Sequence, residues 1–200
     1  MSRSQFAHGQ DPDPLALRAL AHPLRWKLID LLGSEGTATA TRCAEVLGEG
    51  VASCSYHLGI LGKYGYAEML PDQPGREKPW RLPSLFQDLS PAGPDVESVL
   101  ASEAATEVFL DHELARLKDR LRRKSLEPEQ WRKASGIVGE STWMTAAELG
   151  AVWERAQKIM LKFRDRGVDP ALRPRGAREV RLFVAVTVAP PPPTPPKKGA

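Results

Sequence analysis

The chain has 200 residues, of which 42% are hydrophobic and 26% charged, with two cysteines and a net charge of +3. These values are ordinary for a soluble globular protein of one or two small domains, and two cysteines are too few for a disulfide scaffold. No apolar stretch approaches the ~20 residues of a transmembrane helix. The polar start, MSRSQFAHGQDPDP, has no signal-peptide core, so we expect a cytoplasmic protein.

Residues 1–11 are polar, and we expect them to be disordered. After Pro14, leucines recur at steps of three and four, which predicts one apolar stripe on a helix. The stripe consists of Leu17, Leu20, Leu24, Leu28 and Leu31. Pro23 lies inside it, so this proline should end a short first segment or occupy the first turn of the main helix. The helix should stop near Gly33–Gly36.

Two short helices and a hairpin are expected next. Thr41 is a candidate N-cap for a helix over 41–47, with Gly48 as its C-cap, and a second helix should span 52–64. The segments YAEMLPD, QPGREK and PWRLP then predict a strand, a turn and a strand. Two short helices joined by a tight turn and followed by a hairpin predict a winged helix-turn-helix within residues 12–90.

Residues 91–189 are predicted to form a mostly helical region. Apolar periodicity predicts helices over 96–124 and 142–166. The run VRLFVAVTV within 178–189 predicts a mostly buried strand, which needs a partner in the chain or across a dimer. Residues 190–200 are Pro-rich and predict an extended tail. The expected fold class is mainly α with a small β-hairpin wing: a winged helix-turn-helix plus a C-terminal helical region ending in a β-strand.

Four segments in the same order carry a family resemblance. LRALAHPLRWKLIDLL, ATRCAEVLG, SCSYHLGILGKYGYAEM and PGREKPWRL fall within residues 14–83. They resemble the first core helix, the first helix-turn-helix helix, the recognition helix and the wing of the ArsR-type winged-helix regulators. The resemblance implies a transcriptional regulator that binds double-stranded DNA as a homodimer, and helices 96–124 and 142–166 would supply the dimer contacts.

The recognition helix over 52–64 has an inner and an outer face. Leu58 and Leu61 should face inward with Cys54, whereas serine and tyrosine side chains should face a DNA groove, where they can donate hydrogen bonds to phosphates or base edges. An ordinary polar helix face is the alternative interpretation. The candidate DNA-binding residues are Arg42, Ser53, Ser55, Tyr56, His57, Lys63, Arg76 and Lys78.

Charge and glycine content weaken this candidate surface. Residues 1–90 carry nine Lys and Arg against ten Asp and Glu, whereas residues 91–200 carry nineteen against fifteen. Phosphate neutralisation supplies most non-specific DNA affinity, so binding must depend on a few well-placed cations. Gly59 and Gly62 also remove side chains from the recognition helix, and each costs about 1 kcal/mol in a helix. The second hypothesis is therefore a protein-interaction module on a winged-helix scaffold with little DNA affinity.

Other reactive residues give weaker hypotheses. Ser53 and Cys54 lie one turn before His57, a conceivable nucleophile–base pair, but no orienting acid is visible, so we expect no enzyme. We expect His57 to be partly buried with a local hydrogen bond, and Cys43 and Cys54 to be buried thiols. The sequence predicts no metal and no cofactor, because Asp111, His112 and Glu113 are not followed by a second histidine at ligand spacing.

Two features of the C-terminal half have alternative interpretations. The basic run over 116–124 is either a solvated helix face or a flank for DNA phosphates or an acidic partner. Trp143, Trp153 and Met160 are either a candidate pocket for a small-molecule effector or part of a small core or dimer interface.

Overall fold

The computed structural model describes residues 13–71, 77–85, 89–91 and 93–190. The segment expected to be disordered, residues 1–11, lies outside the described residues, as does all but the first residue of the Pro-rich tail. The described chain is mainly helical with a small three-stranded antiparallel sheet. The coarse fold class predicted from the sequence is therefore confirmed.

The N-terminal helices are α1 (Pro14–Leu20) and α2 (Pro23–Glu35), and they are separated at the predicted proline. Pro23 begins α2, where its missing N–H has no helical partner to lose. The leucine stripe is confirmed as core, because Leu20 and Leu28 are fully buried. Trp26 joins these elements: its indole Nε1–H donates to the Leu20 carbonyl at 2.8 Å.

The next helices are α3 (Ala40–Leu47) and α4 (Val51–Lys63). Thr39, and not Thr41, caps α3, because its side chain accepts a hydrogen bond from the backbone N–H of Arg42. Thr41 instead donates its hydroxyl to Glu77 at 3.0 Å. Gly48 adopts φ 67°, the left-handed conformation that favours glycine at a helix C-terminus, so its predicted role as C-cap is confirmed.

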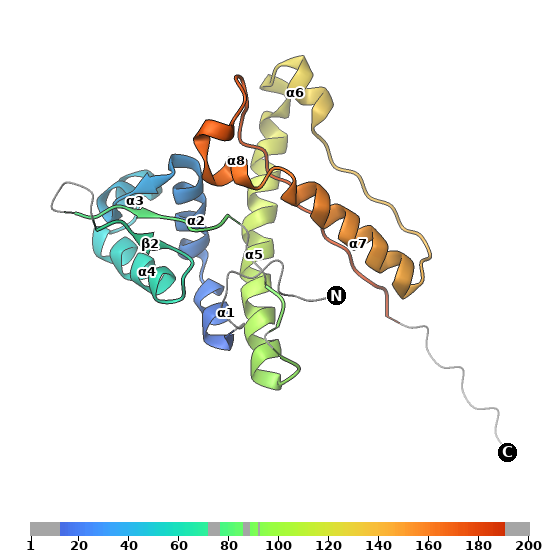
Figure 1. Cartoon of the computed structure of the whole chain (residues 1–200), viewed down its shortest axis with the longest axis horizontal. Helices are drawn as coiled ribbons and strands as arrows, with labels where there is room; N and C mark the ends of the chain where they lie inside the picture. Colours follow the sequence, from blue (N-terminus) through green and yellow to red (C-terminus); the bar gives the residue numbers. More distant parts are fainter. Residues whose placement is uncertain (1–12, 72–76, 86–88, 92, 191–200) are drawn as a thin grey trace.

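The sheet consists of β1 (Thr37–Ala38), β2 (Glu68–Met69) and β3 (Trp80–Arg81), in the order β1-β3-β2. The sequence predicted the β2–β3 hairpin but not β1, which is only two residues long. In the antiparallel register, Trp80 faces Ala38 on one side and Met69 on the other. Residues 72–76, at the expected hairpin turn, lie outside the described residues. Figure 1 shows this small sheet on the same side of the molecule as α2, α3 and α4.

The long helix α5 (Val96–Arg123) agrees with the predicted helix within one residue, and Asp95 caps it by accepting from the Ser98 N–H. Two short helices follow it: the 3-10 helix η2 (Lys124–Leu126) and the α-helix α6 (Glu129–Ala134). Among the described residues, no helix is both long and apolar enough to cross a lipid bilayer.

The C-terminal third differs most from the sequence predictions. The predicted helix over 142–166 is shorter: α7 spans Ala146–Leu161, followed by α8 (Asp165–Val168) and η3 (Pro170–Leu172). The predicted buried strand at 178–189 is wrong for this chain alone, because residues 178–190 have no strand assignment and all are exposed. A strand needs a hydrogen-bonded neighbour, and within the described chain this segment has none. In Figure 1, α7 extends away from the part that holds α1 to α5.

Candidate nucleic-acid interface

The inner face of α4 anchors this helix to the core. Cys54, Leu58 and Leu61 are completely buried, as the helical spacing predicted. The opposite face is open to solvent: Ser55 is exposed and the Tyr56 side chain is 64% exposed. The helix thus presents hydroxyl donors outward from a rigid apolar support, which is the arrangement that a groove-binding helix needs.

His57 lies on the inner side and not on the exposed face. Only 9% of its surface is exposed, and Arg25 of α2 donates from Nε to its Nδ1 at 3.3 Å. The His22 ring centroid lies 4.2 Å away. The expected burial is confirmed, but the expected local hydrogen bond is wrong, since the partner is 32 residues distant. Burial, with His22 and Arg25, lowers the pKa of His57, so its neutral ring acts as the acceptor that joins α4 to α2.

Arg42 on α3 is already held in an ion pair. Its guanidinium donates to both carboxylate oxygens of Glu35, at 2.7 and 3.2 Å, and Glu45 lies 3.8 Å away. This pairing raises the pKa of Arg42 and lowers the pKa of Glu35. To bind a phosphate, Arg42 would have to leave or share a carboxylate, so it is a weaker phosphate ligand than the sequence suggests.

The remaining predicted contacts are placed as follows. Ser53 is half-buried, and Lys63 is exposed with its ammonium 5.1 Å from the centroid of the Tyr64 ring. Lys78 on the hairpin is half-buried. Arg76 lies outside the described residues. Ser55, Tyr56 and Lys63 are therefore the predicted contacts that share the exposed side of α4.

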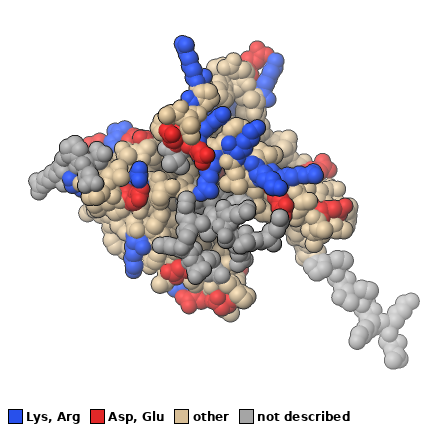
Figure 2. Space-filling model, viewed as in Figure 1, with Lys and Arg blue, Asp and Glu red and all other residues tan. Residues whose placement is uncertain are grey.

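The described part of residues 40–81 carries no net charge. Its four cations are Arg42, Lys63, Lys78 and Arg81, and its four anions are Glu45, Glu49, Glu68 and Glu77. Figure 2 shows red and blue side chains interspersed over this part of the molecule, whereas Lys and Arg are more numerous toward the C-terminal helices. Any nucleic-acid affinity of this face would depend on hydrogen bonding and local charge more than on a broad positive field.

The two glycines of α4 have different surroundings. A Cβ at Gly59 would meet nothing within 4 Å, so this position is an exposed gap in the helix surface. A Cβ at Gly62 would lie 2.6 Å from Cζ3 of Trp80, so Gly62 lets the β3 tryptophan pack directly on the helix backbone. The interpretation of Gly62 as a side chain missing from the DNA surface is therefore wrong.

This contrast gives a matched pair of variants. We expect Gly59→Ala to stabilise the protein by up to about 1 kcal/mol, because alanine favours helix and has open space. Gly62→Ala should instead destabilise it by about 1–3 kcal/mol, because the Trp80 ring must move. Urea unfolding followed by circular dichroism measures both. Equal stabilisation by the two substitutions would contradict the packing role of Gly62.

The candidate effector residues do not form a pocket together. Trp143 is fully exposed and Trp153 is 39% exposed, while Met160 is half-buried, and none of them lines either of the two best-formed pockets found among the described residues. The larger of these pockets, about 370 Å³, lies instead where the end of α2, β3 and η3 meet. Neither pocket supports the effector-pocket interpretation of the tryptophans, which stays a prediction. Within the described chain these tryptophans are not part of a buried core, and the dimer-interface alternative stays open.

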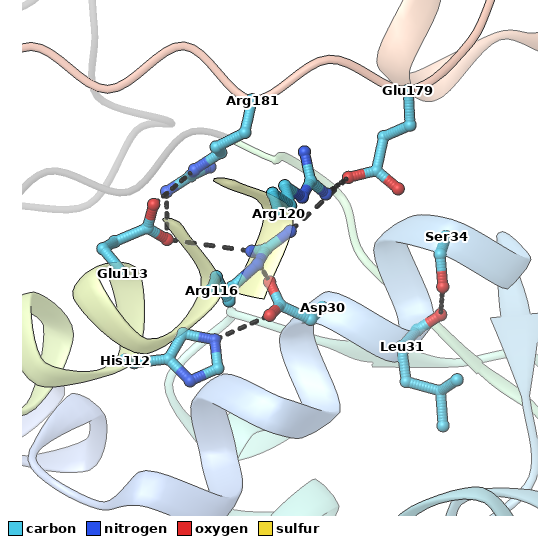
Figure 3. A network of polar contacts seen from close by, with 9 residues as sticks. All are labelled: Asp30, Leu31, Ser34, His112, Glu113, Arg116, Arg120, Glu179 and Arg181. Carbon is cyan, nitrogen blue, oxygen red and sulfur yellow. Dashed lines mark hydrogen bonds and ion pairs between the residues drawn. The ribbon is translucent and has the colours of Figure 1, made fainter. Parts of the chain in front are cut away.

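A polar network, which the sequence did not predict, joins α2, α5 and the C-terminal segment (Figure 3). Asp30 of α2 accepts from Arg116 and lies 2.6 Å from Nε2 of His112. Glu113, only 4% exposed, accepts two hydrogen bonds of 2.8 Å from Arg181. The network therefore fastens residues far apart in the sequence to one side of α5. The one visible signal was Asp30, a charge set between Ile29 and Leu31 in an apolar helix.

The basic run over 116–124 has a mixed role. Arg116 is half-buried in the network, and Arg120 donates to Glu179 at 2.8 Å. Lys118 and Arg122 are exposed, as a solvated helix face predicts. Part of the run is thus engaged in ion pairs within the chain, which reduces the number of cations left for an external partner.

The residues with reactive side chains, Cys43, Cys54 and His57, are all buried. Cys43 and Cys54 are completely buried free thiols, as predicted, and burial raises the pKa of Cys43 to about 11. His57 is bonded to Arg25 and not to Ser53 or Cys54. Among the described residues, no group of three or more His, Cys, Asp and Glu side chains is arranged to hold a metal ion.

Comparison of the chain with protein-family models finds none that matches, and comparison with curated proteins finds no match either. The functional argument therefore depends on the geometry of α3, α4 and the hairpin.

Proposed function

We propose that this protein is a DNA-binding transcriptional regulator of the ArsR-like winged helix-turn-helix type that acts as a homodimer. The observation that carries the proposal is the α3–turn–α4 unit, whose second helix has a fully buried inner face and an outer face of Ser55, Tyr56 and Lys63. The adjoining β2–β3 hairpin would serve as the wing. Such a helix would enter a major groove while the hairpin contacts the backbone.

The outer face of α5 supports the homodimer. Four leucines of this helix are exposed, whereas a helix face in contact only with water needs no such run of apolar side chains: Leu100, Leu110, Leu114 and Leu121. Two copies that pack these faces together would bury the leucines and set the spacing between the two α4 helices. In a dimeric regulator, that spacing determines the separation of the half-sites.

Tyr56 provides the direct test of the DNA hypothesis. We expect Tyr56→Ala to weaken binding to the DNA upstream of the protein's own gene by roughly 10- to 150-fold, because one hydrogen bond to a charged phosphate is worth about 1.5–3 kcal/mol. Fluorescence anisotropy over a range of salt concentrations measures the loss. Trp143→Ala, which removes a fully exposed aromatic side chain far along the sequence, is the matched control. Unchanged affinity for Tyr56→Ala would show that α4 does not face DNA.

A second candidate function is a protein-interaction module. The balanced charge of residues 40–81 and the ion pair of Arg42 with Glu35 favour it. The two functions differ in their response to salt, because DNA binding weakens steeply as phosphate counterions compete. Failure to retain genomic DNA fragments at low salt would reject the regulator and leave the interaction module.

A further inference from the structure

The C-terminal third exposes an unusual amount of apolar surface. No described residue after Glu113 is buried. Large apolar side chains with more than a third of their surface in water continue to the end of the described chain, including Val180 at 61%, Leu182 at 48% and Val188 at 77%. The largest apolar patch of a typical monomer covers about 300–600 Å². The uncharged apolar run over 182–188 is the part of this surface that needs a partner.

The start of this segment is fastened in an extended form along α5. Arg178 donates to Glu127, Glu179 accepts from Arg120, and Arg181 donates to Glu113. The Phe183 ring then lies 6.0 Å from the ring of Phe109. The contacts run from Glu127, just after η2, back to Phe109 of α5, so the segment is antiparallel to the helix. These contacts thus fix the direction and position of the segment at its start, and the remaining apolar residues follow from there.

We propose that residues 180–190 pair, as an antiparallel strand, with the same residues of a second copy of this chain. This inference gives the proposed homodimer a second, specific contact and rests on that part of the proposed function. When two copies of one strand pair antiparallel, each residue lies opposite a residue of the reversed sequence, so the facing side chains must be compatible. Here the uncharged apolar run 182–188 is centred on Ala185, and a twofold axis at Ala185 gives these facing pairs: Leu182 with Val188, Phe183 with Thr187, and Val184 with Val186.

Charge favours this register. The three charged side chains at the start of the segment are already paired, two with α5 and one with Glu127 beyond it, and residues 182–189 offer only uncharged surface. In the proposed register Arg181 faces Ala189, so no two like charges are opposed. Pro190, which has no backbone N–H, ends the ladder opposite Val180. A second copy supplies the uncharged, β-branched strand that this surface needs.

The protein's own sheet is a poor alternative partner. Its outer strands, β1 and β2, are two residues long, whereas the exposed run is several times longer. The ion pairs of residues 179 and 181 also hold the segment on α5. The exposed apolar side chains of residues 180–190 and the exposed leucines of α5 are the surface that a second copy would cover.

Cysteine cross-linking tests the register with a matched pair of variants. In an antiparallel pair, residues directly opposite have Cα atoms about 4.5–5.5 Å apart, within the range of a disulfide. Ala185→Cys should therefore give a covalent dimer under mild oxidation at low protein concentration. Ala189→Cys is the same substitution in the same segment, but its two copies would lie eight residues apart along the ladder, about 27 Å, and should not cross-link. The wild-type chain, whose own thiols are buried, is the background.

A charge placed near the axis tests the energetics. Val184→Asp would place two carboxylates among the apolar side chains of the ladder, so sedimentation should show a weaker dimer than the wild type, with the helical circular dichroism signal unchanged. A wild-type monomer, a Val184→Asp dimer as tight as the wild type, or equal cross-linking at positions 185 and 189 would overturn the proposal. These measurements use no DNA. A cross-linked dimer that binds no DNA would therefore reject the proposed function and retain this inference.

Discussion

Replacing Trp26 by alanine should lower the free energy of unfolding by about 3–5 kcal/mol, the usual cost of removing a large buried aromatic side chain. Trp26 is 3% exposed, and its ring centroid lies 4.9 Å from that of Phe109 on α5. The substitution also removes the indole N–H that donates a hydrogen bond to the Leu20 carbonyl at the end of α1. One side chain thus joins α1, α2 and α5, and the loss should affect all three helices together.

Trp143→Ala is the matched control for this experiment. It removes the same side chain from a position that is 100% exposed, so its free energy of unfolding should stay within about 0.5 kcal/mol of the wild type. Both substitutions remove a tryptophan and therefore change the fluorescence signal, so urea unfolding should be followed by far-ultraviolet circular dichroism. If Trp26→Ala is as stable as Trp143→Ala, the core does not depend on the junction of α1, α2 and α5.

Sequence reasoning was most accurate where short-range rules determine the structure. Pro23 marked the break between α1 and α2, and Gly48 marked the end of α3, because backbone geometry alone fixes both positions. The limits of α5 were predicted within one residue, since its capping residue and apolar spacing are local. The inner face of α4 was also correct, because helical periodicity determines which side of a helix is apolar.

The errors at the candidate site have a common physical cause, which is dependence on distant residues. Gly62 is small because Trp80, eighteen residues later, packs against it. His57 takes its hydrogen bond from Arg25, and Arg42 is neutralised by Glu35 on another helix. None of these partners lies within one helical turn, so no local pattern reveals them.

The apolar run after residue 178 shows a different limit. Its composition predicted a strand that needs a partner, but the described chain supplies no partner and the segment forms no strand. Strand formation depends on hydrogen bonds to a neighbour, whereas a helix satisfies its own backbone. The sequence therefore predicted a requirement, and a second copy of the chain would meet it.

Glu113→Gln is the second substitution for which we expect a large effect. It removes the charge of a carboxylate that is 4% exposed and that accepts two hydrogen bonds from Arg181, while Arg116 lies 3.7 Å away. Removing one partner of a buried pair costs about 3–5 kcal/mol, and the partial exposure of both arginines should place this loss nearer 2–3 kcal/mol. Urea unfolding measures the change in free energy.

The same substitution should also loosen the C-terminal segment, because Arg181 would lose its bidentate partner. We expect trypsin, which cleaves after arginine, to cut at Arg178 and Arg181 faster than in the wild type. Asp119→Asn is the control on the same helix: its pair with Arg123 is exposed, and such pairs contribute less than about 1 kcal/mol. Equal effects of Glu113→Gln and Asp119→Asn on unfolding and on cleavage would mean that the network does not hold the segment on α5. The position from which residues 180–190 reach a second copy would then not be fixed by Glu113.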